Sequence, residues 1–262
     1  MREVTVSFGG IKALEDVSVE AAGGEVVGVI GPNGAGKTTL FNVICGFVVP
    51  NSGTISWRDR SLNGLSPHRL SSLGISRTLQ GVGLFSKLTV LENVMTGADR
   101  FRRARYGGAL LGIWTSDRDE RALRKRARAS LERLDCTGLE DRLPGTLPFA
   151  VQKRVALARA LACDPELLLL DEPAGGLSAD EMSELGQLIQ SLGKSIAVMV
   201  VEHHMDLVMS VCDRVVVLDF GSVIAAGAPA AIRENPRVLE AYLGRDAGEE
   251  NVAAAGTTDA GG

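Results

Sequence analysis

The sequence predicts an α/β fold with a parallel-sheet core, and three observations support that prediction. The chain has 262 residues, of which 45% are hydrophobic, so it can bury the core of one large domain or two small ones. A glycine-rich turn at 31–36 lies between a strand-like run and a helix-like run. Beyond residue 167, strand-like and helix-like runs alternate, which is typical of a parallel sheet covered by helices.

The elements before residue 80 are short and of mixed type. Apolar runs with strand character lie at 4–6, 17–19, 25–30, 54–57 and 74–79. A helix is expected over 36–47, directly after the glycine-rich turn, and Pro67 is expected to begin a helical turn.

Residues 84–161 are predicted to form a helical subdomain inserted into the core, because no strand-like run occurs there. Helical periodicity covers 90–96, 118–134 and 151–161. The alternation that follows comprises strands at 167–170, 196–201 and 215–218 and helices at 178–192 and 205–212. Ser178 and Glu181 have capping-box spacing. The domain is predicted to span 1–244, and 245–262, which contain little to bury, are predicted to be a disordered tail.

The composition excludes several classes of protein. The apolar runs, such as 196–201, are far shorter than the roughly 18 to 20 residues that cross a bilayer. The N-terminus has no secretory signal and the four cysteines have no paired spacing, so we expect reduced thiols in the cytoplasm. Residues 100–128 hold ten Lys or Arg against three acidic residues. Few aromatic residues, Phe101, Tyr106 and Trp114, lie among these basic residues, which favours a solvated helix face over a nucleic-acid site.

The glycine-rich turn fits the phosphate-binding pattern G-x-x-x-x-G-K-[ST], in the strand-to-helix position that the pattern requires. Glycines let backbone N–H groups approach phosphates closely, and the helix N-terminus adds the positive end of its dipole. Lys37 is expected to reach the β- and γ-phosphates, and Thr38 to bind Mg²⁺. The residues predicted to bind the nucleotide here are Gly31, Asn33, Gly34, Ala35, Gly36, Lys37, Thr38 and Thr39.

Two acidic residues, Asp171 and Glu172, follow a run of four leucines. Ligands of open α/β sheets bind at the carboxyl ends of the strands, so both carboxylates are expected at the site. Asp171 suits Mg²⁺, bound directly or through water. Glu172 suits a general base that orients and deprotonates an attacking water. Such a pair is a weak signal alone, but together with the phosphate loop it predicts a nucleotide hydrolase.

The order of these motifs resembles the ATP-binding subunits of ABC transporters over about residues 3–244. Phe8 falls where that family stacks an aromatic ring on adenine, Gln80 matches the Q-loop, and His203 matches the switch histidine. The resemblance implies catalytic roles for Gln80 and His203, and a contact between Gln80 and Mg²⁺. It also implies a P-loop ATPase of ABC type, with an N-terminal antiparallel β section beside the parallel core.

Within that family, the chain is similar to importer subunits for branched-chain and other hydrophobic amino acids. The stretches that carry this similarity are 66–94, 147–161 and 221–244. The ATPase of lipopolysaccharide export has a similar C-terminal ending and is the nearest alternative. A soluble ABC ATPase of translation or DNA repair is a further alternative, but the chain has neither a second cassette nor long heptad coils.

The family signature LSGGQ aligns with 147–151, where this chain has Leu-Pro-Phe-Ala-Val. The resemblance therefore places Pro148, Phe149 and Ala150 at the nucleotide of an opposing subunit. Ala150 stands where these importers usually have glycine, which leaves two interpretations. In the first, the alanine weakens this half-site, because the position needs a left-handed backbone or because the methyl group pushes the phosphate outward, and the chain works in a heterodimer. In the second, the alanine lies at a helix start and fits without cost.

The resemblance implies an assembly larger than one chain. Two ATP-binding subunits are expected to sandwich two ATP molecules, each bound by one chain's phosphate loop and the other chain's signature loop. Integral membrane permease subunits are implied as partners, with an external solute-binding protein acting indirectly. We expect the permease contact at 80–92. These partners place the chain on the cytoplasmic face of the inner membrane, with ATP and Mg²⁺ as cofactors and no nucleic acid.

Overall fold

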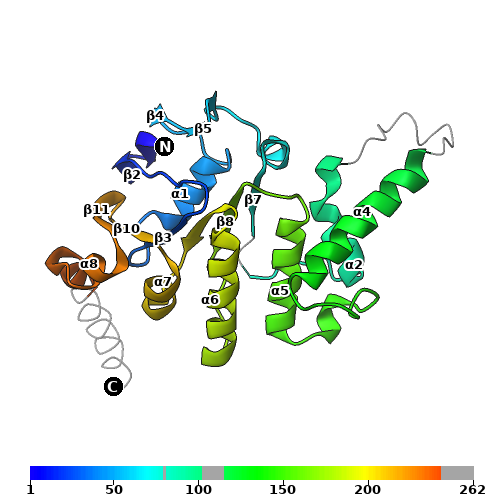
Figure 1. Cartoon of the computed structure of the whole chain (residues 1–262). Helices are drawn as coiled ribbons and strands as arrows, with labels where there is room; N and C mark the ends of the chain where they lie inside the picture. The colour runs from blue at the N-terminus through cyan, green and yellow to red at the C-terminus, as the bar shows by residue number, and fades with distance from the viewer. Residues whose placement is uncertain (79–80, 102–114, 243–262) are drawn as a thin grey trace, which may run out of the picture. The chain divides into compact units, whose positions relative to one another are not determined.

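The computed structural model describes residues 1–78, 81–101 and 115–242 (Figure 1). The chain forms two compact units. The first comprises Met1–Ala21, Glu25–Ser66 and the chain from Val201 onward, and the second comprises Ala22–Gly24 and Pro67–Val200. Several sequence predictions lie wholly or partly outside the described residues, among them Gln80, the basic segment at 100–128 and the C-terminal tail.

The first unit contains the strand that leads into the glycine-rich turn. This strand, β3 (Val26–Ile30), is buried along its whole length and pairs in parallel with β10 (Arg214–Asp219). Both faces of such a strand are covered, which explains its unbroken apolar sequence. β11 (Ser222–Gly227) adds to β10 in the antiparallel direction. The helices of this unit are α1 (Lys37–Ile44), α7 (Met205–Val211) and α8 (Pro229–Arg233).

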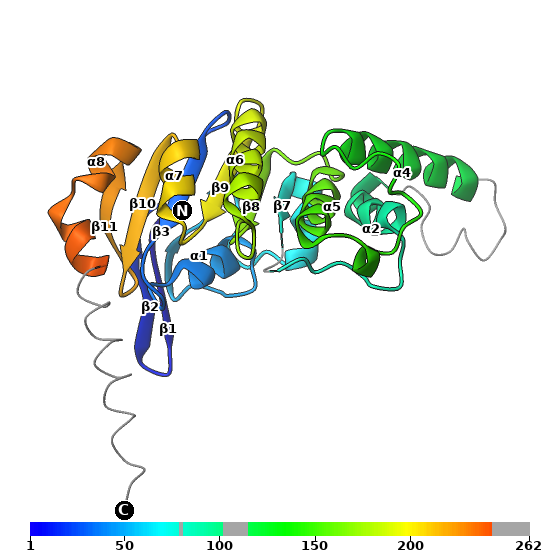
Figure 2. The same cartoon turned by 90° about the horizontal axis from the view of Figure 1, so that it is seen from below.

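An antiparallel section also belongs to the first unit. β1 (Arg2–Phe8) and β2 (Ile11–Val17) form a hairpin, visible as adjacent dark blue strands in Figure 2, and β4 (Ser52–Thr54) pairs with the other edge of β1. The prediction of a strand at 17–19 is wrong, because the Gly9-Gly10 turn reverses the chain at once and the second strand ends at Val17. A separate hairpin joins β5 (Ser56–Trp57) to β6 (Arg60–Ser61).

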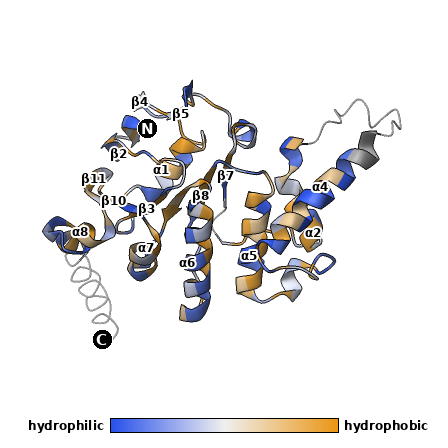
Figure 3. Cartoon of the chain, in the orientation of Figure 1, coloured by the Kyte–Doolittle hydropathy of each residue, from blue (hydrophilic) through white to orange (hydrophobic). Residues whose placement is uncertain are grey.

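The second unit contains three strands in the order β9-β8-β7. β8 (Leu167–Asp171) and β9 (Ala197–Val201) are fully buried, and β8 pairs in parallel with β7 (Ile75–Arg77). The four leucines of β8 stand out as hydrophobic in Figure 3. α6 (Ala179–Gly193) follows β8 and begins with the predicted capping box, in which Ser178 and Glu181 bond reciprocally. The α/β fold class predicted from the sequence is confirmed.

Helices dominate the middle of the second unit. They are η1 (Pro67–Arg69), η2 (Ser71–Leu73), α2 (Val90–Gly97), η3 (Asp99–Phe101), α4 (Thr115–Glu132), η4 (Pro144–Thr146) and α5 (Phe149–Leu161). α2 and α5 cross so closely that a Cβ added at Gly97 would lie 1.9 Å from the Arg159 carbonyl oxygen. α4 is hydrophilic over much of its length (Figure 3). Within the described residues, no helix combines the length and the apolar character needed to span a membrane.

Candidate active site

The turn after β3 is closely surrounded by backbone. Gly31 has a φ of 149° and Gly36 a φ of 103°. A Cβ added at Gly31 would lie 2.1 Å from the Leu218 carbonyl oxygen, and one added at Gly36 would lie 2.5 Å from the Ala13 carbonyl oxygen. Only glycine fits at these two positions without a shift of the backbone. The sequence between them is therefore held as a tight loop against β10 and β2.

Lys37 lies at the junction between this loop and α1, and only 7% of it is exposed. Its Nζ donates hydrogen bonds to the carbonyl oxygens of Gly31, at 2.6 Å, and Pro32, at 2.9 Å. No side chain caps the N-terminus of α1, where Gly36 is the N-cap residue. Backbone N–H groups at an uncapped helix start attract anions. The loop thus concentrates a buried ammonium and a helix dipole in one place.

Two further residues of the predicted site belong to the same unit. Phe8 ends β1 and is 52% exposed. His203 follows β9, and its side chain is 50% exposed. The neighbouring Glu202 is fully buried, and its backbone N–H donates to the Val29 carbonyl oxygen at 3.3 Å, which fixes this segment beside β3. The Glu202 carboxylate accepts hydrogen bonds from the backbone N–H groups of His203, at 2.9 Å, and His204, at 3.2 Å.

Asp171 and Glu172 lie in the second unit, at the end of β8. The Asp171 carboxylate is only 5% exposed and forms an ion pair with Arg77, in which Nη2 and Oδ2 are 2.7 Å apart. Thr78 fixes the backbone beside it, because its N–H donates to the Leu169 carbonyl oxygen and its hydroxyl accepts from the Asp171 N–H. The sequence analysis gave no role to Arg77 or Thr78. Neither the residue types nor their spacing signals the pair between Arg77 and Asp171.

The signature segment is in the same unit as these carboxylates. Pro148 is the N-cap residue of α5, and Phe149 and Ala150 are its first two residues. Ala150 has helical backbone, so the left-handed conformation considered for it does not occur, and the helix-start interpretation describes its backbone correctly. Lys153, one turn further along, donates to the carbonyl oxygens of Glu172 and Pro173. Sequence analysis did not predict this link.

Known proteins match this arrangement of motifs. A sequence profile of the ABC transporter family matches residues 14–175, which is more than half of the chain. The chain belongs to the ABC transporter family. A second profile, of branched-chain amino acid ATP-binding cassette transporters, matches residues 222–248. As an ABC cassette, the chain binds a nucleotide and is an ATPase.

One curated relative and two solved structures illustrate the similarity. The high-affinity branched-chain amino acid transport ATP-binding protein LivG of Salmonella typhimurium is 40% identical over 239 residues, which cover 90% of this chain and 94% of LivG. The ADP conformation of MJ1267, an ATP-binding cassette, superposes with a TM-score of 0.81 at 30% identity, covering 93% and 97% of the two chains. MJ0796, solved as a dimer bound to ADP and phosphate, gives 0.71 at 28% identity, covering 87% and 97%.

Proposed function

We propose that this ABC cassette hydrolyses MgATP to power an importer of branched-chain or other hydrophobic amino acids. The observation that carries the proposal is the similarity to LivG along nearly the whole length of both chains. The C-terminal match to the branched-chain profile supports the same transporter class. The domain is proposed to span 1–244, with 84–161 as its helical subdomain and 245–262 as a tail.

The nucleotide is proposed to bind at the loop after β3, with its phosphates against the backbone of Gly31, Asn33, Gly34, Ala35 and Gly36. Lys37 would then exchange its bonds to loop carbonyl oxygens for bonds to the β- and γ-phosphates, and Thr38 and Thr39 would complete the cradle. Phe8 would stack on the base. Its exposed position at the end of a strand leaves a ring face accessible.

The donor set fits Mg²⁺, which prefers oxygen ligands in near-octahedral geometry. Thr38 offers an exposed hydroxyl. Asp171 uses Oδ2 in its pair with Arg77, and within the described residues its Oδ1 accepts no hydrogen bond, so this oxygen can face a metal-bound water. Gln80 is the third proposed ligand. When bound, Mg²⁺ would neutralise charge on the phosphates.

Glu172 is proposed as the general base. Its carboxylate would take a proton from the water whose oxygen attacks the γ-phosphorus, while the bond to the β-phosphate oxygen breaks and ADP leaves. His203 would contact the γ-phosphate or the water from a segment that the buried Glu202 holds in place. Gln80 is proposed to assist in positioning the same water.

The assembly is proposed to be a dimer, as in MJ0796, in which Pro148, Phe149 and Ala150 face the nucleotide of the opposing subunit. Integral membrane permease subunits would hold the dimer at the cytoplasmic face of the inner membrane, and a solute-binding protein would act through them. The proposed permease contact is the segment before α2, where Phe85 is 54% exposed. No nucleic-acid partner is proposed.

The segment around Phe85 is shaped by one buried side chain. Asn93 is fully buried, and the two N–H groups of its Nδ2 are shared among the carbonyl oxygens of Phe85, Leu88 and Thr89 at 2.9 to 3.0 Å. Its Oδ1 accepts from the Phe85 N–H at 2.8 Å. The exposed ring is therefore presented on a fixed backbone, which suits a docking contact.

Capture of the chain from membranes tests the proposal. We expect permease subunits to copurify, and the reconstituted complex with its binding protein to hydrolyse ATP faster when leucine or a similar amino acid is added. Glu172→Gln keeps the shape of the side chain but removes the base, so hydrolysis should fall by about a hundredfold or more while ATP binding survives. Lys37→Ala should lose ATP binding instead. Full activity of Glu172→Gln would contradict the assignment of the base.

A further inference from the structure

The backbone at Glu172 has a conformation that L-residues seldom adopt. Its φ is 47°, in the left-handed region. Such a conformation is disfavoured by the contact between Cβ and the following carbonyl group, so it persists only where surrounding interactions hold it. The turn that follows reaches Gly176, whose φ is 78°. The interactions that hold this turn therefore also decide where the Glu172 carboxylate points.

Lys153 of α5 contacts this turn through its ammonium group. Its Nζ donates to the Pro173 carbonyl oxygen at 2.7 Å and approaches the Glu172 carbonyl oxygen at 3.4 Å. Hydrogen bonds from a charged donor are stronger than neutral ones. The Phe149 ring lies close to the same turn, because a Cβ added at Gly176 would be 3.0 Å from its Cε1. The N-terminal part of α5, from Phe149 to Lys153, thus lies against the 172–176 turn.

We propose that Lys153 is a positioning residue for hydrolysis: it holds the strained turn at 172–173 and so aims the Glu172 carboxylate. The inference rests on the proposed role of Glu172 as the base. It has a consequence for the dimer, because Phe149 and Ala150 of the same helix end are proposed to face the partner's nucleotide. In each subunit, Lys153 would then connect two places: the start of α5, which contacts the nucleotide bound by the other subunit, and Glu172, the base for the nucleotide bound by the same subunit.

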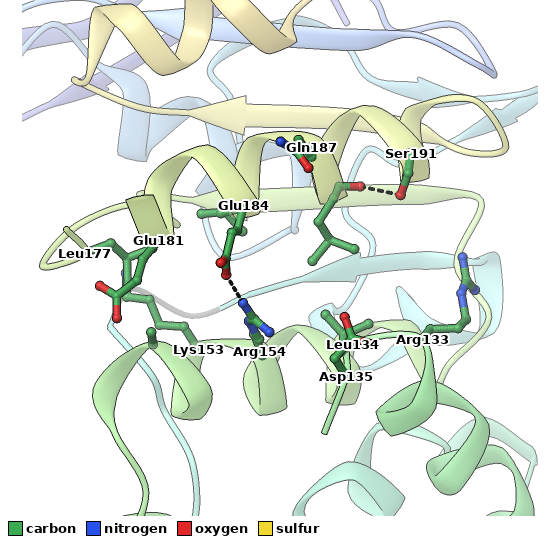
Figure 4. Close-up of a pocket in the computed structure, with 13 residues that line it drawn as sticks. Arg133, Leu134, Asp135, Lys153, Arg154, Leu177, Glu181, Glu184, Gln187 and Ser191 are labelled. Carbon is green, nitrogen blue, oxygen red and sulfur yellow. Dashed lines mark hydrogen bonds and ion pairs between the residues drawn. The ribbon is translucent and has the colours of Figure 1, made fainter. Parts of the chain in front are cut away.

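The adjacent residue, Arg154, provides a matched control. Figure 4 shows the two side chains next to each other on α5, with Arg154 directed at Glu184 of α6, where it forms an ion pair. These residues line a cleft of about 430 Å³ between α5 and α6. Loss of Arg154 removes one positive charge from the same helix turn, and among the described residues its hydrogen bond and ion pair are with Glu184, not with 172–176.

The test compares Lys153→Met, Lys153→Arg and Arg154→Met in the full chain, using ATP affinity, the kcat for hydrolysis and amide hydrogen exchange at 174–177. For Lys153→Met we expect kcat to fall about tenfold, ATP affinity to stay within about twofold, and exchange at 174–177 to accelerate about tenfold. Lys153→Arg retains a charged donor, so its kcat and its exchange at 174–177 should be close to those of the wild type. For Arg154→Met, the kcat and the exchange at 174–177 should stay within about twofold of the wild-type values.

Each outcome decides the inference. Equal losses in Lys153→Met and Arg154→Met would overturn it, and so would unchanged exchange at 174–177 in Lys153→Met. If Lys153→Met does not fold, Lys153→Gln, which keeps a neutral donor, should give an intermediate kcat, and a kcat equal to that of the wild type would overturn the proposal. Hydrogen exchange needs no hydrolysis, so it reports on the turn even if Glu172→Gln shows that the base lies elsewhere.

Discussion

Removal of the Arg77 side chain should destabilise the protein strongly, because its partner is buried. The two side chains of this ion pair are 13% and 5% exposed, and Nη2 and Oδ2 are 2.7 Å apart. Breaking a buried pair by deleting one partner costs about 3 to 5 kcal/mol, since the remaining charge is left without compensation. Arg77 retains some contact with solvent, so we expect Arg77→Met to lower the free energy of unfolding by about 3 kcal/mol, near the lower end of this range. In a chain of this size that lowers the Tm by about 6 to 12 °C.

Two further variants separate the buried charge from lost packing. Asp171→Asn added to Arg77→Met removes the uncompensated carboxylate, so the double variant should be more stable than Arg77→Met alone. Arg124→Met breaks an exposed pair with Glu120, in which the side chains are 43% and 49% exposed, and should cost about 0.5 kcal/mol or less. Thermal unfolding followed by circular dichroism measures all three. Equal Tm values for Arg77→Met and Arg124→Met would refute the reasoning.

Two other predictions follow from local geometry. Gly36→Ala places a Cβ 2.5 Å from the Ala13 carbonyl oxygen, whereas the Cβ of Gly34→Ala meets open space and only the φ of 79° costs about 1 to 2 kcal/mol. Without nucleotide, the Tm should therefore fall much further for Gly36→Ala than for Gly34→Ala. Similar Tm values would be inconsistent with the contact at Ala13. Hydrogen bonds from Ser178 lower the pKa of Glu181 below its ordinary value of 4.5. The stability that this carboxylate adds is therefore fully present above pH 4.5 and is lost as the pH falls through the lower pKa of the folded state. The Tm difference between the wild type and Glu181→Ala should accordingly shrink in acid, and a difference independent of pH would argue against the capping box as its source.

Local sequence was sufficient where a short segment determines its own structure. The four leucines before Asp171 form a buried strand, and Ser178 and Glu181 form a capping box, because both patterns depend on neighbours in the chain. β11 was not predicted, since its run of Ser, Val, Ile, Ala, Ala and Gly has little strand-forming alternation and pairs only because β10 lies beside it.

Long-range contacts were beyond prediction from the sequence. Arg77 and Asp171 are separated by 94 positions, and neither residue type nor spacing indicates their ion pair. The link from Lys153 to the carbonyl oxygen of Pro173 spans 20 positions and joins a side chain to the backbone, which leaves no trace in the pattern of residue types. The phosphate-loop motif locates a candidate site, while the residues that hold Asp171 and Glu172 in place emerge only from the fold.

The amide of Asn93 has a consequence for the thermodynamics of the permease docking proposed at Phe85. One buried side chain hydrogen-bonds to the backbone at Phe85, Leu88 and Thr89, so that segment has little conformational freedom to lose when a partner covers it. Ordering a loop at an interface ordinarily subtracts from the free energy of association. Here that cost has already been met during folding, and most of the gain from covering the Phe85 ring is available for binding. If the proposed permease contact at Phe85 is correct, Asn93→Ala should weaken association with the permease even though Asn93 itself is fully buried.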